Sequence, residues 1–215
     1  MPRKRRPLDR DDGVVRDASL IVIASEDRYA VKDYFDKFQS KRFRFRVLPT
    51  DDGRSSPEAV LQRLDDYRQE FDVGEDDELW ACIDLDHWAD ANHIANLRRV
   101  RQMAGQKGYR LAISHPCFEF WILLHFQDSP TSEIGRCADV SAILKGHSPG
   151  YSKASIKDLV LTVQQVEQAI ERAEKLISED PFSRDRPSTQ MHLILESLRS
   201  KGSIQLKAPD SADLS

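Results

Sequence analysis

The sequence predicts an α/β protein whose central sheet is mostly parallel and flanked by helices. Short apolar runs suited to buried strands recur along the first 126 residues, and amphipathic segments separate them. The resulting order, β-α-β-α-β-α-β-α, is typical of a parallel sheet with helices on both faces. A length of 215 residues, 40% hydrophobic and 32% charged, suits one globular domain or one domain with a small appendage.

Four segments are predicted as strands: 19–24, 41–48, 79–83 and 109–114. The first is a branched apolar run, typical of a strand buried on both faces. In the second, phenylalanines alternate with Arg42, Arg44 and Arg46, which predicts one solvated face. These arginines either protect a sheet edge from aggregation or contact phosphates, and edge protection is slightly favoured.

Helices are predicted between and after these strands, at 31–38, from Pro57 to Phe71, at 90–106 and at 117–126. Ser55 or Ser56 can cap the second, with Pro57 in its first turn. The fourth is apolar all round, which is typical of a buried helix.

Four regions are predicted along the chain. Residues 1–17, where Arg3-Lys4-Arg5-Arg6 precedes Asp9, Asp11 and Asp12, form a disordered tail, and residues 18–127 form the α/β core. Residues 128–201 form a helical extension packed on the core, and residues 202–215 form a second disordered tail. Within the extension, 128–150 is loop-rich, 160–177 is an amphipathic helix, and Ser188 or Thr189 caps a last helix.

Composition excludes several classes of protein. The net charge of -4 gives no global attraction to nucleic acid, so such binding needs a local patch. Cys82, Cys117 and Cys137 are too few and too dispersed for a disulfide framework or a zinc site, and Cys82 is expected in the core. Since no segment resembles a membrane span or a secretory signal, a cytoplasmic protein is expected.

Acidic residues follow the predicted strands. Asp84 and Asp86 come directly after the 79–83 run, and on an extended chain their side chains point the same way. Glu26 follows the first strand and Glu119 lies just beyond the fourth, so all four acids are expected at the ligand-binding rim. Close carboxylates repel unless a proton or a cation separates them, and Mg²⁺ or Mn²⁺ suits an all-oxygen site.

Each acid also has a simpler interpretation. Asp84 and Asp86 can start a turn and cap the next helix. Glu26 and Glu119 can interact favourably with the positive, N-terminal end of a helix dipole. Their joint placement favours a site. Because Glu119 lies in an apolar run, its carboxylate needs a partner, so we predict that it points toward Asp84 and Asp86 rather than into solvent.

Several segments together resemble the RloB family, over about residues 19–199. They are Asp33-Tyr34-Phe35, Asp84-Leu85-Asp86, the run 114–126 (the most specific), Tyr151-Ser152-Lys153, and Pro187-Ser188-Thr189 before His192. The pattern of a strand with Glu26 and a strand with Asp84 and Asp86 also resembles the Toprim domain. That domain is shared by topoisomerases, primases, recombination proteins and OLD-type nucleases.

This resemblance implies a Toprim-type, Mg²⁺- or Mn²⁺-dependent nuclease that cleaves the phosphodiesters of DNA or RNA. It implies a role in bacterial restriction or phage defence with an AAA- or ABC-type ATPase encoded nearby, and a homo-oligomer is left open. Glu26, Asp84 and Asp86 would be the catalytic and metal-binding acids, and Glu119 a further ligand. Candidates for phosphate binding or proton transfer are Arg28, His87, His115, His125, Lys153 and His192.

The chain departs from the family pattern after its first acid. The family usually carries a glycine and a second glutamate there, where this chain has Asp27 and Arg28, and Val31 replaces a further acid. Loss of the glycine stiffens the turn that presents Glu26, and Arg28 could instead bind a phosphate. These departures leave open a second interpretation: a non-catalytic Toprim-like binding or regulatory module of an ATPase-containing defence complex.

Overall fold

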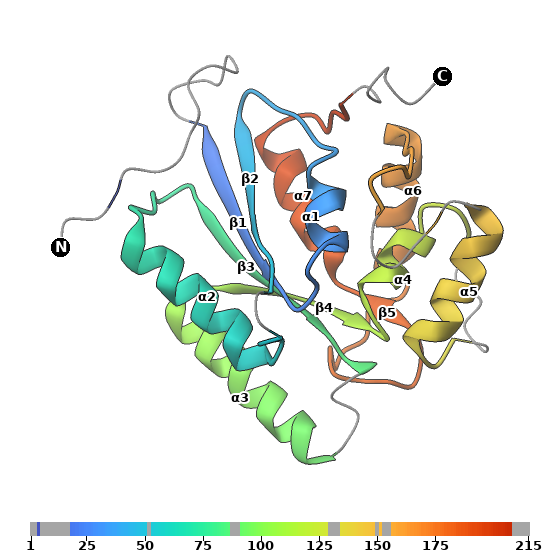
Figure 1. Ribbon diagram of the computed structural model, residues 1–215, viewed down its shortest axis with the longest axis horizontal. Coiled ribbons are helices and arrows are strands. Elements are labelled where there is room, and N and C mark those ends of the chain that lie inside the picture. The colour runs from blue at the N-terminus through green and yellow to red at the C-terminus, as the bar shows by residue number, and fades with distance from the viewer. Residues whose placement is uncertain are drawn as a thin grey trace.

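The centre of the fold is a five-stranded sheet in the order β2-β1-β3-β4-β5. This computed structural model describes residues 4, 18–50, 53–86, 91–128, 134–148, 151 and 156–207. The strands are β1 (Ser19–Ser25), β2 (Phe43–Leu48), β3 (Glu78–Asp84), β4 (Arg110–His115) and β5 (Ser188–Thr189). The first four are parallel and β5 is antiparallel to β4 (Figure 1). The predicted α/β class with a mostly parallel sheet is confirmed.

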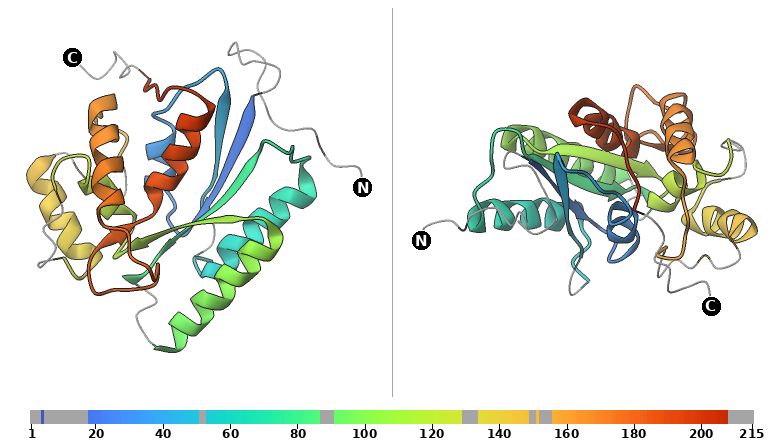
Figure 2. Two further views of the ribbon diagram at one scale, coloured as in Figure 1. Left: turned by 180° about the vertical axis from the view of Figure 1, so that it is seen from behind. Right: turned by 90° about the horizontal axis from the view of Figure 1, so that it is seen from above.

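Helices cover both faces of this sheet. They are α1 (Ala30–Phe35), α2 (Pro57–Glu70), α3 (Ala91–Lys107), α4 (Phe118–Leu123), α5 (Cys137–His147), α6 (Val163–Glu174) and α7 (Met191–Lys201). Helices α2 and α3 lie on one face, and α1, α4, α6 and α7 pack on the other (Figures 1 and 2). Ser56 caps α2 as predicted, because its hydroxyl accepts a hydrogen bond from the amide of Ala59 at 3.2 Å.

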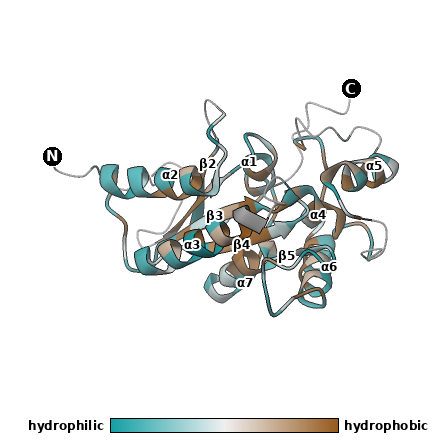
Figure 3. Ribbon diagram, turned by 90° about the horizontal axis from the view of Figure 1, so that it is seen from below, coloured by the Kyte–Doolittle hydropathy of each residue, from teal (hydrophilic) through white to brown (hydrophobic). Residues whose placement is uncertain are grey.

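Side-chain alternation along β1 divides the hydrophobic core in two. Ile21 and Ile23 pack with α1, α4 and α7, while Leu20 and Val22 pack with α2 and α3. All seven residues of β1 are buried, as expected of a central parallel strand. In Figure 3 the hydrophobic colour lies on the central strands β3 and β4, whereas α2 and α3 carry much hydrophilic colour.

Strand β2 lies at an edge of the sheet. Phe43 and Phe45 pack on the core, whereas Arg46 is exposed and Arg44 donates a hydrogen bond to the carbonyl of Ser40 at 3.2 Å. The arginine face therefore occupies the edge position that the sequence favoured for it.

Three predicted helices are shorter than their apolar patterns. Helix α1 ends at Phe35, and Phe38 instead forms an isolated bridge with Leu206. Helix α4 ends at Leu123, because the ring of His125 binds the carbonyl of Trp121 that the next helical amide would use. Helix α6 begins after Thr162, whose side chain accepts from the amide of Gln165, and Val160 lies outside it with 65% of its surface exposed.

Two elements in the second half differ from prediction. Helix α5 lies within the segment expected to be loop-rich. Its first turn lacks a serine or threonine cap. The side chain of Asp139 instead accepts hydrogen bonds from the amides of Gly135 and Arg136, at 3.1 and 2.9 Å. Ser188 and Thr189 do not cap the last helix, since they form strand β5. The hydroxyl of Thr189 nevertheless accepts a hydrogen bond from the amide of Met191 at 3.3 Å.

The predicted C-terminal disordered tail begins too early. Ile204 is buried, the amide of Gln39 donates to the carbonyl of Gln205 at 3.0 Å, and Lys207 donates to Lys37 at 2.8 Å. Residues 208–215 lie outside the described residues, as does the predicted tail 1–17 apart from Lys4. Lys4 pairs with Phe71 in an isolated bridge. Within the described ranges no helix has the length and hydropathy of a membrane span.

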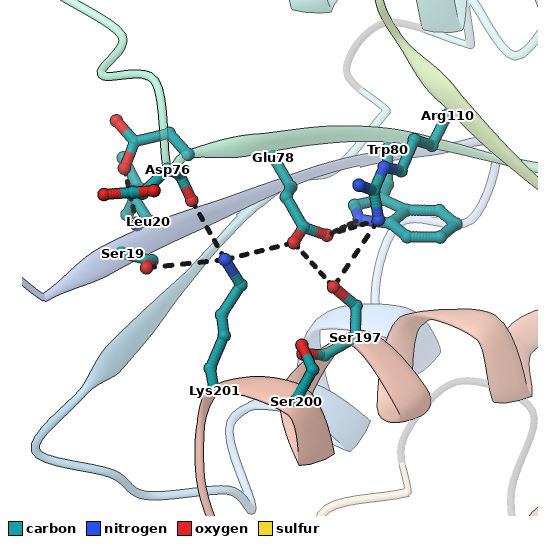
Figure 4. Close-up of polar contacts among 10 residues, drawn as sticks. Ser19, Leu20, Asp76, Glu78, Trp80, Arg110, Ser197, Ser200 and Lys201 are labelled. Atoms are coloured by element: carbon teal, nitrogen blue, oxygen red, sulfur yellow. Dashed lines mark hydrogen bonds and ion pairs between the residues drawn. The ribbon is translucent and has the colours of Figure 1, made fainter.

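A buried carboxylate joins the last helix to the amino-terminal end of the sheet. Glu78 is 8% exposed and accepts hydrogen bonds from Trp80 at 2.9 Å and Ser197 at 2.5 Å (Figure 4). Lys201 and Arg110 form ion pairs with it, each at 3.2 Å. Lys201 also donates to the carbonyl of Asp76, so the network fixes α7 against the start of β3.

Candidate active site

The strand order reverses between β1 and β3. From β1 the chain passes through α1 to β2 on one side, and it returns through α2, on the opposite face, to β3. Open sheets of this kind bind ligands outside the carboxyl ends of the strands at such a switch point. Glu26 directly follows β1 and Asp84 ends β3, so both flank it.

Glu26 and Asp84 line the same recess. Its other polar lining residues are Ser25, Asp27 and Ser114. Alternation along β3 places Asp84 on the same side as Cys82, which faces the helical layer of α1, α4 and α7. The recess therefore lies at the carboxyl ends of β1 and β3, and Phe118 of α4 forms part of its lining.

Asp84 is the electrostatic centre of this rim. Burial raises the pKa of its carboxyl well above the usual value, and the charges of Glu26, Glu119, Asp86 and Asp27 raise it further. Acids from three separate strand ends thus act on one carboxyl group. A bound cation would relieve this repulsion, and the oxygen donors suit Mg²⁺ or Mn²⁺.

The three predicted catalytic acids are neighbours but do not form a compact triad. In the described part of the chain, a single group of three candidate ligand atoms lies within 4.8 Å of one another, and it comprises Asp86, Cys117 and Cys137. Glu26 and Asp84 lie outside that group. Metal binding by all three acids would therefore require side-chain adjustment.

Glu119 is buried beside the rim, as its sequence context predicted. It lies in the first turn of α4 with 2% of its surface exposed, and its charge raises the pKa of Asp84. Its Oε2 atom lies 3.3 Å from the sulfur of Cys137. The carboxylate therefore avoids solvent and lies within electrostatic range of Asp84.

The turn after β1 is held by Asp27, at the position where the sequence resemblance led us to expect a glycine. Asp27 accepts hydrogen bonds from the amides of Tyr29, at 2.7 Å, and Ala30, while its own carbonyl accepts from the hydroxyl of Ser25 at 2.7 Å. Arg28 is exposed, 5.3 Å from the ring centre of Tyr29. The side chain of Asp27 thus fixes the turn next to Glu26.

His115 is the candidate histidine beside the rim. It is 6% exposed, and burial lowers its pKa, as does the charge of Arg184, whereas Asp86 raises it. His192 lies elsewhere: its ring bonds the carbonyl of Thr189 at 3.1 Å, burial lowers its pKa, and the acid that acts on it is Glu174 of α6. His87 and Lys153 lie outside the described residues.

His125 is a core residue rather than a proton donor. Its Nδ1 bonds the carbonyl of Trp121 at 2.9 Å, and its Nε2 bonds the hydroxyl of Tyr34 at 3.1 Å. Burial lowers the pKa of His125 to about 4, so the ring is neutral at pH 7.

We therefore expect His125 to make the fold acid-sensitive. A histidine with a depressed folded-state pKa stabilises fully above its unfolded pKa of about 6.5, and this stability is lost as pH falls toward the folded value. Between pH 7 and pH 5 the loss is roughly 2 kcal/mol. Urea unfolding should show that the His125→Gln variant is less stable than wild type at pH 7 but loses less stability between pH 7 and pH 5. His147→Gln, at an exposed position, should lose as much as wild type; equal losses in all three proteins would contradict the assignment.

Cys117 and Cys137 form a disulfide beside the rim, with their Cα atoms 5.6 Å apart. The three cysteines were expected to be too few and too dispersed for a disulfide framework, and no sequence pattern indicated this single bond, which forms because the chain between the two cysteines folds back through α4. Cys82 is free and buried, as predicted.

Other residues at the rim were missed. Burial raises the pKa of Tyr151, as do the charges of Glu119 and Asp27. Arg184, in the segment before β5, lowers the pKa of His115 through its charge. Tyr151 lies in the segment Tyr151-Ser152-Lys153, one of those that carry the family resemblance, and this segment could have indicated it as a site residue. No sequence pattern indicated Arg184.

Fold and rim together define an α/β protein with clustered acids at its topological switch point. The RloB-like protein family model matches residues 21–198, and the chain belongs to this family. No curated protein and no solved structure matches the chain.

Proposed function

We propose that this protein is a Toprim-type nuclease that uses Mg²⁺ or Mn²⁺ to cleave nucleic-acid phosphodiesters. The observation that supports it is the convergence of Glu26, Glu119 and Asp86 on Asp84 at the switch point. Acids used only as helix caps would not need to act on one another. The family match supports the same proposal from the sequence.

The residues divide into distinct roles. Asp84 and Asp86 would hold the metal, with Glu119 as a further ligand, and Glu26 would be either a ligand or the base that accepts the proton of the attacking water. When bound, the metal supplies charge that polarises the phosphate and helps to ionise water. His115 would donate a proton to the leaving oxygen, with the charge of Asp86 favouring its protonated form against the opposing effects of burial and Arg184. Arg28 and Arg184 would be cations for the phosphate backbone.

The biological setting is a proposal from the family resemblance. We propose that the protein acts in bacterial phage defence with an AAA- or ABC-type ATPase, on DNA or RNA, with a homo-oligomer left open. One observation favours the alternative, a non-catalytic module of the same complex. The family's glycine and second glutamate after the first acid are replaced by Asp27, which closes the turn, and Arg28, which adds a positive charge.

Cleavage and metal binding test the proposal together. Wild type should cleave plasmid DNA or RNA with Mn²⁺, and Asp84→Ala combined with Asp86→Ala should lower the rate by more than about 100-fold, the order expected from loss of electrostatic stabilisation. Calorimetry should show Mn²⁺ binding that weakens in Glu26→Gln.

Glu70→Gln is the matched control, because Glu70 is exposed and pairs with Lys4. It should leave cleavage and metal affinity unchanged. Activity that survives the double substitution would sink the nuclease proposal. An inactive wild type that binds no metal at millimolar concentration would favour the module.

A further inference from the structure

We propose that Cys117, Cys137 and Asp86 form a Zn²⁺ site in the thiol-reduced protein, with Glu119 as the fourth ligand. The two sulfurs and an Asp86 carboxylate oxygen all lie within 4.8 Å of one another. The Oε2 atom of Glu119 lies 3.3 Å from the Cys137 sulfur. This site differs from the proposed Mg²⁺ or Mn²⁺ site in its two thiolate ligands, but the two sites share Asp86 and Glu119.

The backbone brings these groups together from three segments: the loop after β3, the start of α4 and the start of α5. Beyond the end of β3, the amide of Leu85 donates to the carbonyl of Ser114 at 2.9 Å, and that of Asp86 donates to Pro116 at 3.0 Å. The loop after β3 is therefore fixed to the residue just before Cys117. Cys137 begins α5, which packs against α4, and Glu119 lies in the first turn of α4.

The donor types select the metal. Thiolates are soft ligands that favour zinc over magnesium, and zinc binds two sulfurs and two oxygens or nitrogens tetrahedrally. Both cysteines are buried, at 1% and 6% exposure, and Glu119 is buried at 2%. Buried anionic groups gathered this closely are stabilised by a shared cation.

The site exists only after the disulfide is opened. A dithiol transfers two electrons and two protons to the Cys117–Cys137 disulfide, which gives two thiols while the dithiol becomes a disulfide. Binding of Zn²⁺ then releases the two thiol protons as two zinc–thiolate bonds form. Oxidation by a disulfide would expel the metal, so the pair makes zinc occupancy depend on the thiol state.

Direct zinc binding tests this, and its readout does not depend on nuclease activity. The full-length protein is reduced with a dithiol, freed from it without oxygen, and titrated with Zn²⁺ against a chromogenic chelator. The reduced protein should bind one zinc ion per chain, and the oxidised protein should not compete with the chelator. Cobalt in place of zinc should give a thiolate-to-metal charge-transfer band.

Substitutions identify the ligands. Cys117→Ser and Cys137→Ser should each weaken zinc binding by more than roughly 100-fold, beyond the 10–100-fold typical of losing an outer partner. Asp86→Asn should weaken it as well, and circular dichroism checks that each variant folds. Cys82→Ala is the matched control, because Cys82 is buried and unpaired, and it should retain zinc binding.

The proposal is overturned if the reduced wild type fails to compete for zinc, or if the variant lacking both Cys117 and Cys137 binds it as tightly as wild type. Unchanged affinity in Asp86→Asn would reduce the site to a simple dithiol chelate and overturn it too. None of these outcomes involves cleavage, so failure here is distinct from failure of the proposed nuclease.

Discussion

Asp84→Asn should stabilise the metal-free protein while it removes function. The substitution keeps the size of the side chain and removes the charge on which Glu26, Glu119 and Asp86 converge. Relief of like-charge repulsion on the order of 1 kcal/mol would raise the melting temperature by about 2–4 °C for a chain of this length. Because the same carboxylate is the proposed metal ligand, cleavage should fall by more than roughly 100-fold.

The sign of the pH effect follows from the raised pKa of Asp84. In the folded, metal-free protein this carboxyl retains its proton at a higher pH than in the unfolded chain. Stability is therefore lost as pH rises from the unfolded value, about 3.9, through the raised folded value. Asp84→Asn should lack this loss, so its advantage over wild type should grow with pH.

Calorimetric melting in the presence of a chelator, and then with Mn²⁺, measures both effects. The matched control is Asp65→Asn, where the carboxylate accepts from Tyr109 at 2.8 Å and pairs with Lys107. That variant should melt below wild type. If Asp84→Asn also melts lower without metal, the acids do not repel one another and the electrostatic argument for the site fails.

Much of the sheet could be predicted because its signals are local. Apolar runs gave the four parallel strands, and residues directly beyond them gave Glu26 and Asp84 at adjacent strand ends. Strand β5 could not be found this way. It has two residues, and it exists because Ser114 and Thr189, far apart in sequence, pair their hydroxyls at 2.8 Å.

The unpredicted parts of the site share the same cause. Cys137 reaches Cys117 only because α5 packs on α4, and the charge of Glu119 raises the pKa of Tyr151, which follows α5 in the chain. Spacing along the sequence carries no record of such contacts. His125 shows the opposite error: its chemistry made it a candidate donor, whereas the bonds of its ring to Tyr34 and Trp121 make it part of the core.

Glu78→Ala should cause the largest loss of stability among these substitutions. Burial raises the pKa of Glu78, but hydrogen bonds from Ser197, Trp80 and Lys201, with the charge of Arg110, outweigh it and hold the pKa below its usual value. The folded state thus favours the carboxylate. Its stabilising effect is present above the unfolded pKa, about 4.3, and is lost as pH falls through the folded value.

Breaking a buried ion pair by removing one partner costs about 3–5 kcal/mol, and partial exposure of Lys201 and Arg110 lowers the expectation to about 2–3 kcal/mol. Glu78→Gln keeps the shape and can still accept hydrogen bonds, so it should lose roughly 1 kcal/mol. Glu70→Ala, which removes an exposed pair with Lys4, should change stability by less than about 0.5 kcal/mol.

Urea unfolding at pH 7 measures these differences, and a double-mutant cycle with Lys201→Met isolates the pair. A coupling energy near zero between Glu78 and Lys201 would contradict a network that holds α7 to β3. Glu78 starts β3 and Asp84 ends it, so the two groups lie at opposite ends of one strand. Folded Glu78→Gln should therefore bind Mn²⁺ as wild type does, since what it loses is the attachment of α7 and not the acids of the rim.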